Sequence, residues 1–158
     1  MLAKKIKYTD YNGVDQVETF HFAINKAELL ELELSTNGGY ENYLRRLINS
    51  RDQAEITKIF KKFILMSYGV KSDDGKRFIK SEELSKEFEQ TEAYSELFVE
   101  LATDTKAATD FFNGIIPPAL YAEVKKEVEK RGLKDTSELA TAIIEDSGDE
   151  KDVANNNT

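Results

Sequence analysis

The chain has 158 residues, of which 40% are hydrophobic and 33% charged, and its formal net charge at pH 7 is −8. A chain of this length forms one domain with a sizeable core, and its apolar residues are too frequent for global disorder. No apolar run is long enough to span a bilayer, and the negative charge opposes binding to nucleic acid. The absence of Cys excludes disulfides and thiolate metal sites. Because no secretory signal is visible either, we expect a soluble protein of a reducing cytoplasm.

The N-terminal segment predicts a β-hairpin. Residues 5–9 alternate between polar and apolar, and residues 17–24 place Phe20, Phe22 and Ile24 on one face. The Asn12-Gly13 pair between the two runs is typical of a tight turn in which both residues have positive φ. Because an isolated two-stranded hairpin is marginally stable in water, we expect it to pack on the rest of the chain.

Helical periodicity begins after Ile24. Asn25 and Asp52 each have Glu three residues later, which is the pattern of a helix start, and a further short helix is predicted over residues 40–48. The helix that follows Asp52 is the clearest in the chain, because residues 56–64 place apolar side chains at i, i+3, i+4, i+7 and i+8. Gly69 is expected to end it.

The next segment predicts a second, smaller hairpin and three more helices. Asp74-Gly75 is a turn pair, flanked by short apolar pieces within residues 70–80. The last of the three helices is expected to reach Gly114, before Pro residues force an extended break over residues 115–118. The expected N-caps of these helices are Ser81, Thr91 and Asp104.

These patterns predict an α+β fold that is predominantly α-helical, with an N-terminal hairpin packed on helices and a flexible acidic C-terminal tail. We expect three parts: a hairpin-plus-helices domain over residues 1–117, a helical appendage over 118–145 and a disordered tail over 146–158. Within the appendage, a charged helix is predicted from 119 to a stop at Gly132, and a shorter one over 137–145. Residues 145–158 contain five acidic residues and one basic residue, which favours disorder.

No catalytic, cofactor or metal site is predicted. His21, the only histidine, has no nucleophile and orienting carboxylate at a suitable spacing, so we interpret it as a residue of the hairpin's more polar face. A calcium loop with Gly75 at its sixth position would put Val70 first and Ser81 twelfth, where a Glu is required. Glycine-rich phosphate-binding motifs are absent. A hydrolase that uses carboxylates stays open, because carboxylate geometry is not visible in a sequence.

Two groups of residues are candidates for binding a partner. Basic residues gather between positions 45 and 62, where they form either a positive face for an acidic partner or ordinary solvated helix surfaces. Four large apolar residues lie within six positions before the Pro pair, where they form either part of the core or an exposed docking patch. The candidates are Arg45, Arg46, Lys58 and Lys62 in the first group, and Phe111, Phe112, Ile115 and Ile116 in the second.

Three segments carry a resemblance to a known family: residues 66–80 (MSYGVKSDDGKRFIK), 88–98 (FEQTEAYSELF) and 107–117 (AATDFFNGIIP). They resemble tail assembly chaperones of long-tailed siphophages that infect Gram-positive hosts. The opening hairpin, with its Tyr-Asn-Gly turn followed by Phe-x-Phe, is also similar. The likeness extends from residue 3 to residue 118.

This resemblance implies a non-enzymatic assembly factor without a cofactor. Such a protein binds and solubilises the tape measure protein in the host bacterial cytoplasm, helps to recruit tail tube subunits, and is absent from the mature virion. The chain is similar to the short product of a pair that is made by programmed frameshifting. Self-association into rings or filaments stays open, and no membrane or nucleic-acid partner is expected. The alternative is a structural tail or head-tail connector component of the virion.

Overall fold

The computed structural model describes residues 1–130, except for the side chains of residues 41, 44, 45 and 48. The chain divides into two compact units: Met1–Asn25 with Arg51–Tyr121, and Lys26–Ser50 with the residues from Ala122. The predicted stop at Gly132, the helix over 137–145 and the tail over 146–158 lie outside the described residues. The sequence-based domain boundaries therefore stay a prediction. Among residues 1–130, no helix combines the length and apolar character needed to cross a membrane.

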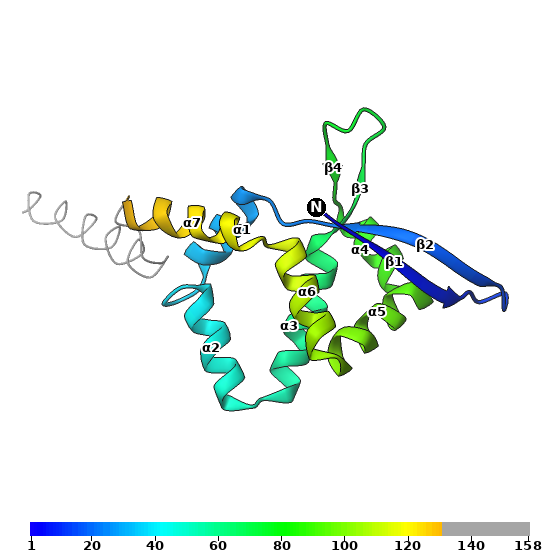
Figure 1. Cartoon of the computed structure of the whole chain (residues 1–158), viewed down its shortest axis with the longest axis horizontal. Helices are drawn as coiled ribbons and strands as arrows, with labels where there is room; N and C mark the ends of the chain where they lie inside the picture. The colour runs from blue at the N-terminus through cyan, green and yellow to red at the C-terminus, as the bar shows by residue number, and fades with distance from the viewer. Residues whose placement is uncertain (131–158) are drawn as a thin grey trace, which may run out of the picture. The chain divides into compact units, whose positions relative to one another are not determined.

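An antiparallel sheet of four strands, in the order β1-β2-β3-β4, lies in the first unit (Figure 1). The register of the first hairpin pairs Leu2 with Phe22 and Thr9 with Asp15, so the predicted N-terminal hairpin is confirmed. The second hairpin, predicted near residues 70–80, is also confirmed, and it joins the sheet because β3 pairs with the end of β2. The strands are β1 (Leu2–Thr9), β2 (Asp15–Phe22), β3 (Tyr68–Lys71) and β4 (Phe78–Ile79).

The turn of the first hairpin differs from the prediction. Gly13 has a φ of +79°, whereas Asn12 does not have a positive φ, so a turn with two positive-φ residues was wrong. Instead, the Asp10 carboxylate accepts hydrogen bonds from the backbone N–H groups of Asn12 (2.9 Å) and Val14 (3.0 Å). The side chain of Gln16 also donates to it, and these bonds hold the pKa of Asp10 below its usual value. The Asp10 carboxylate therefore helps to close the loop, together with the positive φ of Gly13.

The helices of the first unit start where the sequence predicts. Side-chain oxygens of the expected caps accept hydrogen bonds from backbone N–H groups at distances of 2.9–3.1 Å. These oxygens satisfy amide groups that have no partner inside the helix. The helices and their caps are α3 (Gln53–Ser67; Asp52), α4 (Glu82–Glu89; Ser81), α5 (Glu92–Thr103; Thr91) and α6 (Thr105–Ile115; Asp104).

Two helix ends differ from the prediction in detail. α3 ends at Ser67 with Tyr68 as its C-cap, so it stops just before Gly69 as predicted, but Gly69 has no positive φ and continues as a residue of strand β3. α6 continues past Gly114 to Ile115, and the extended break is shorter than expected, because α7 (Pro118–Lys130) already begins at the second Pro. Proline suits the first position of a helix, where its missing N–H would have no intrahelical partner.

The core of the first unit lies between the sheet and helices α3–α6. Phe22 is fully buried, and its ring centroid lies 5.2 Å from that of Phe111 and 5.8 Å from that of Phe88. Tyr68 stacks on Phe88 at 4.3 Å. Because α5 and α6 also contact β1, the expected packing of the hairpin on the helices is confirmed, and so is the predominantly helical α+β fold.

The second unit contains α1 (Lys26–Ser35), α2 (Tyr40–Ser50) and most of α7. The buried Glu33 carboxylate accepts the backbone N–H of Tyr40 at 3.0 Å, which ties the start of α2 to α1. Lys26 Nζ lies 3.5 Å from Glu123 Oε2 and links α1 to α7. The apolar side chains that are buried in this unit are Leu29, Leu32, Tyr40, Val124 and Val128.

Asp104→Ala is expected to lower the free energy of unfolding by about 1 kcal/mol. The Asp104 carboxylate accepts the N–H groups of Lys106 (2.9 Å) and Ala107 (3.0 Å), and alanine leaves both without this partner. Urea unfolding followed by circular dichroism measures the loss. Asp104→Asn keeps an accepting oxygen and should retain most of the stability. An equal loss in both variants would mean that the cap is not what Asp104 contributes.

Candidate functional site

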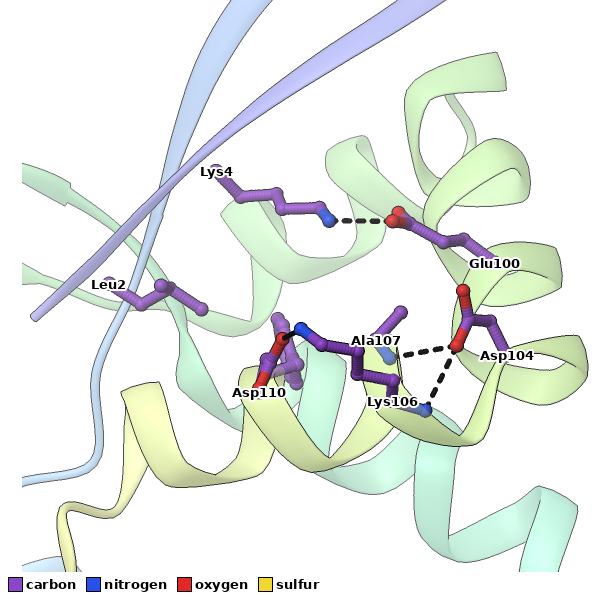
Figure 2. Close-up of a pocket in the computed structure, with 8 residues that line it drawn as sticks. Leu2, Lys4, Glu100, Asp104, Lys106, Ala107 and Asp110 are labelled. Atoms are coloured by element: carbon purple, nitrogen blue, oxygen red, sulfur yellow. Dashed lines mark hydrogen bonds and ion pairs between the residues drawn. The ribbon is translucent and has the colours of Figure 1, made fainter.

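A hollow of about 300 Å³ lies where β1 meets α5 and α6 (Figure 2). β1 contributes two of its lining residues, α5 contributes one, and the remainder come from α6 and the residue that precedes it. Leu2, Ala107 and Phe111 supply apolar surface, and the other lining side chains are charged. The full lining is Leu2, Lys4, Glu100, Asp104, Lys106, Ala107, Asp110 and Phe111.

The charged side chains of the hollow form two ion pairs. Lys4 Nζ lies 2.8 Å from Glu100 Oε1 and connects β1 to α5. Lys106 Nζ lies 2.7 Å from Asp110 Oδ2, and this hydrogen bond raises the pKa of Lys106. Asp104 adds a third carboxylate, which caps α6. The lining therefore combines apolar surface with two paired cations and three carboxylates.

The described residues contain no metal-binding cluster. Within residues 1–130, no group of three or more His, Asp or Glu side chains is placed so that it could hold a metal ion. His21 lies on β2 opposite Ala3 and Gly69, and it does not line the hollow. The lining of the hollow therefore offers apolar surface from Leu2, Ala107 and Phe111 next to charged side chains.

The four apolar candidates near the end of α6 occupy different environments. Phe111 and Ile115 are only 2% and 1% exposed, so burial in the core describes these two. Phe112 is half-buried, with its ring centroid 5.6 Å from that of Phe60 and 5.4 Å from that of Phe63. Ile116 is half-buried at the C-cap of α6. Of the four, Phe111 alone lines the hollow.

The basic candidates fall in different units. Lys58 and Lys62 are exposed on α3 of the first unit, and Lys58 Nζ pairs with Glu55 at 2.8 Å. Arg46 is on α2 of the second unit, where it donates to the carbonyl oxygen of Asn37 at 3.2 Å. The side chain of Arg45 lies outside the described part of the structure. Lys58 and Lys62 are four residues apart on α3 and therefore lie on the same side of that helix. A positive face that includes the arginines stays a prediction.

Sequence reasoning missed the hollow. Lys4 and Glu100 are 96 positions apart, and neither belongs to a motif. The alternation along β1 shows that Leu2, Lys4 and Ile6 share a face, but nothing in it identifies the helix that this face meets. The sequence therefore indicates which face of β1 packs inward, but it does not indicate which helix that face contacts.

Comparison with known proteins identifies the family. No curated protein and no solved structure matches the chain. Residues 1–157, nearly the whole sequence, match the family described as phage tail assembly chaperone. This match agrees with the resemblance of residues 3–118, and chaperones are a non-catalytic kind of protein. The chain therefore belongs to the phage tail assembly chaperone family.

Proposed function

We propose that this chaperone binds the tape measure protein and keeps it soluble in the host cytoplasm during tail assembly. In this proposal it also helps to recruit tail tube subunits, leaves before the virion is finished, and corresponds to the short product of a frameshifted pair. The family membership supports a protein partner in tail assembly. The hollow between β1, α5 and α6 is the observation that carries the binding proposal.

The hollow fits an apolar side chain of an amphipathic helix. A long helical protein repeats large apolar residues on one face every three or four positions, and these aggregate when they stay exposed. Leu2, Ala107 and Phe111 would contact such a side chain. The ion pairs that surround them would meet the polar residues that flank the apolar stripe of the partner.

Many copies would act together along one tape measure protein. A single hollow buries little area, so each contact is weak and reversible. A long rod with repeated apolar positions offers many such sites, and occupancy rises when bound copies are linked. Weak individual contacts also allow tube subunits to displace the chaperone. The net charge of −8 would keep the coated complex soluble.

Ala107→Leu is expected to abolish solubilisation of the tape measure protein. Ala107 is half-buried and lines the hollow, so a leucine at this position fills the space that the partner side chain needs. Alanine and leucine both favour helix, so α6 should persist. Co-expression followed by separation of soluble from insoluble protein measures the effect, and affinity should fall by about tenfold or more.

Ala102→Leu is the matched control. It makes the same substitution at an exposed position of α5 that does not line the hollow, so it should solubilise the tape measure protein like the wild type. Full solubilisation by Ala107→Leu would contradict the hollow as the binding site. Failure of the wild-type protein to solubilise its tape measure protein would contradict the function itself. Stoichiometric amounts in purified particles, measured by mass spectrometry, would indicate a structural component instead.

A further inference from the structure

The rim of the hollow has an excess of negative charge at one end. Its charged groups are the carboxylates of Glu100, Asp104 and Asp110 and the ammonium groups of Lys4 and Lys106. Each ammonium group is already paired, Lys4 with Glu100 at 2.8 Å and Lys106 with Asp110 at 2.7 Å. Asp104 forms no ion pair within residues 1–130. The rim therefore has one surplus negative charge, which lies at Asp104.

Two carboxylate oxygens at this end are available to a partner. Asp104 Oδ1 accepts both amide hydrogen bonds of the α6 cap, at 2.9 and 3.0 Å, and Oδ2 has no partner in the described part of the chain. Figure 2 shows this second oxygen pointing away from the α6 amides, toward the side where Glu100 lies. Glu100 binds Lys4 through Oε1, and its Oε2 likewise has no partner among the described residues. Asp104 is exposed, and the Glu100 side chain is 42% exposed, so a partner can reach both.

The surplus charge lies one helical turn from the apolar part of the hollow. Asp104 and Ala107 are three positions apart, and Ala107 and Phe111 are four apart, so these residues follow one side of α6. A partner helix that lies along α6 repeats its own side chains at the same spacing of about 5.4 Å per turn. When an apolar side chain of the partner contacts Ala107, a partner residue three or four positions away therefore lies beside Asp104.

Charge determines which residue type suits that neighbouring position. Lys or Arg would bind the free oxygens of Asp104 and Glu100, and a charge-assisted hydrogen bond is stronger than a neutral one. Glu or Asp would instead bring like charges together, which weakens binding. The two lysines of the rim do not offset this repulsion, because each is already neutralised by its own carboxylate.

We propose that the hollow preferentially binds amphipathic helices in which a Lys or Arg lies one turn from the apolar residue that enters it. Asp104 and Glu100 determine this specificity. The inference rests on the proposed function, because it names the chemistry of the segments that the same hollow binds. It adds a requirement to that function: apolar positions with a basic neighbour one turn away should be occupied before those with an acidic neighbour.

Binding of three synthetic helical peptides to the full chain tests the proposal. Each is an alanine-based peptide of about 18 residues with two leucines one turn apart, and Lys, Gln or Glu lies one turn before and after the leucines. Fluorescence anisotropy of labelled peptides at low ionic strength should show about tenfold tighter binding of the Lys peptide than of the Glu peptide. The difference should shrink at high salt. Ala107→Leu should weaken the binding of all three peptides, because it fills the apolar part of the hollow.

Asp104→Asn/Glu100→Gln should reduce the preference for Lys over Glu to less than about twofold. It removes both carboxylates, while asparagine still caps α6. The matched control is Asp52→Asn/Glu55→Gln, which also neutralises an N-cap aspartate and an ion-paired glutamate, but outside the hollow. This control should keep the full preference. If the double variant loses its circular dichroism spectrum, Asp104→Asn alone replaces it and should lower the preference about threefold.

Two results would overturn this inference and leave the proposed function standing. One is equal binding of the Lys and Glu peptides by the wild type. The other is an equal loss of preference in the control, which would mean that the net charge of the whole chain attracts the Lys peptide. If none of the three peptides binds the wild type, the hollow does not bind amphipathic helices, and this inference fails together with the binding proposal on which it rests.

Discussion

Phe22→Ala is expected to lower the free energy of unfolding by about 3–5 kcal/mol. Phe22 is fully buried, and its ring lies against those of Tyr68 (5.9 Å), Phe88 (5.8 Å) and Phe111 (5.2 Å) between centroids. The surrounding aromatic rings belong to a strand and two helices, so they cannot all move to fill the space. Because small domains are stable by only about 5–15 kcal/mol, this loss is a large fraction of the total.

Urea unfolding followed by circular dichroism and tyrosine fluorescence measures this effect, since the chain has seven Tyr and no Trp. Val17→Ala is the control on the same strand. Its side chain is exposed, so it should change stability by less than about 0.5 kcal/mol. A loss below about 1 kcal/mol for Phe22→Ala would contradict the position of Phe22 at the centre of the core.

Local signals in the sequence were enough to locate the helices of the first unit. Asp52, Ser81, Thr91 and Asp104 each precede a helix, and each caps it in the structure. A cap uses contacts within two or three residues, so its sequence pattern already contains the whole interaction. The turns of both hairpins were located for the same reason, although Asp10 closes the first one in a way that the Asn-Gly pair does not indicate.

Contacts between distant residues could not be predicted. β3 pairs with β2 through Gly69 and Tyr68, which follow a helix that has no sequence link to the first hairpin. A glycine after a helix is typical of a helix stop, but Gly69 is required by its close approach to β4. A glycine in the sequence indicates a constrained position, but it does not show whether the constraint is a helix end or a close approach to a neighbouring strand.

The hollow could not be predicted because none of its lining residues belongs to a recognisable sequence motif. Phe111 stood out in an apolar segment, but whether it is buried or exposed depends on β1 and α5, which are remote in the chain. From the sequence, Lys4 and Glu100 would be interpreted as solvated charges, whereas in the fold Lys4 Nζ lies 2.8 Å from Glu100 Oε1. The hollow therefore depends on how β1, α5 and α6 pack together, and no sequence motif predicts it.

Gly69→Ala is expected to destabilise the protein by about 1–3 kcal/mol. A Cβ at this position would lie 2.8 Å from the carbonyl oxygen of Ile79 and 2.7 Å from a ring carbon of Phe78. One of these atoms is backbone of the paired strand, so it can move only if β3 and β4 separate. The φ of Gly69 is not positive, so steric overlap rather than backbone strain causes the loss. Urea unfolding measures it.

Gly114→Ala makes the same substitution where the neighbour can yield. The three atoms nearest to a Cβ at Gly114 all belong to the side chain of Leu2, with a methyl carbon at 2.9 Å, and a rotamer change can relieve this contact. Alanine also favours helix over glycine by about 1 kcal/mol, which offsets the remaining overlap within α6. Gly114→Ala should therefore stay within about 1 kcal/mol of the wild type. Equal destabilisation by both variants would mean that the loss at Gly69 does not come from the fixed backbone of β4.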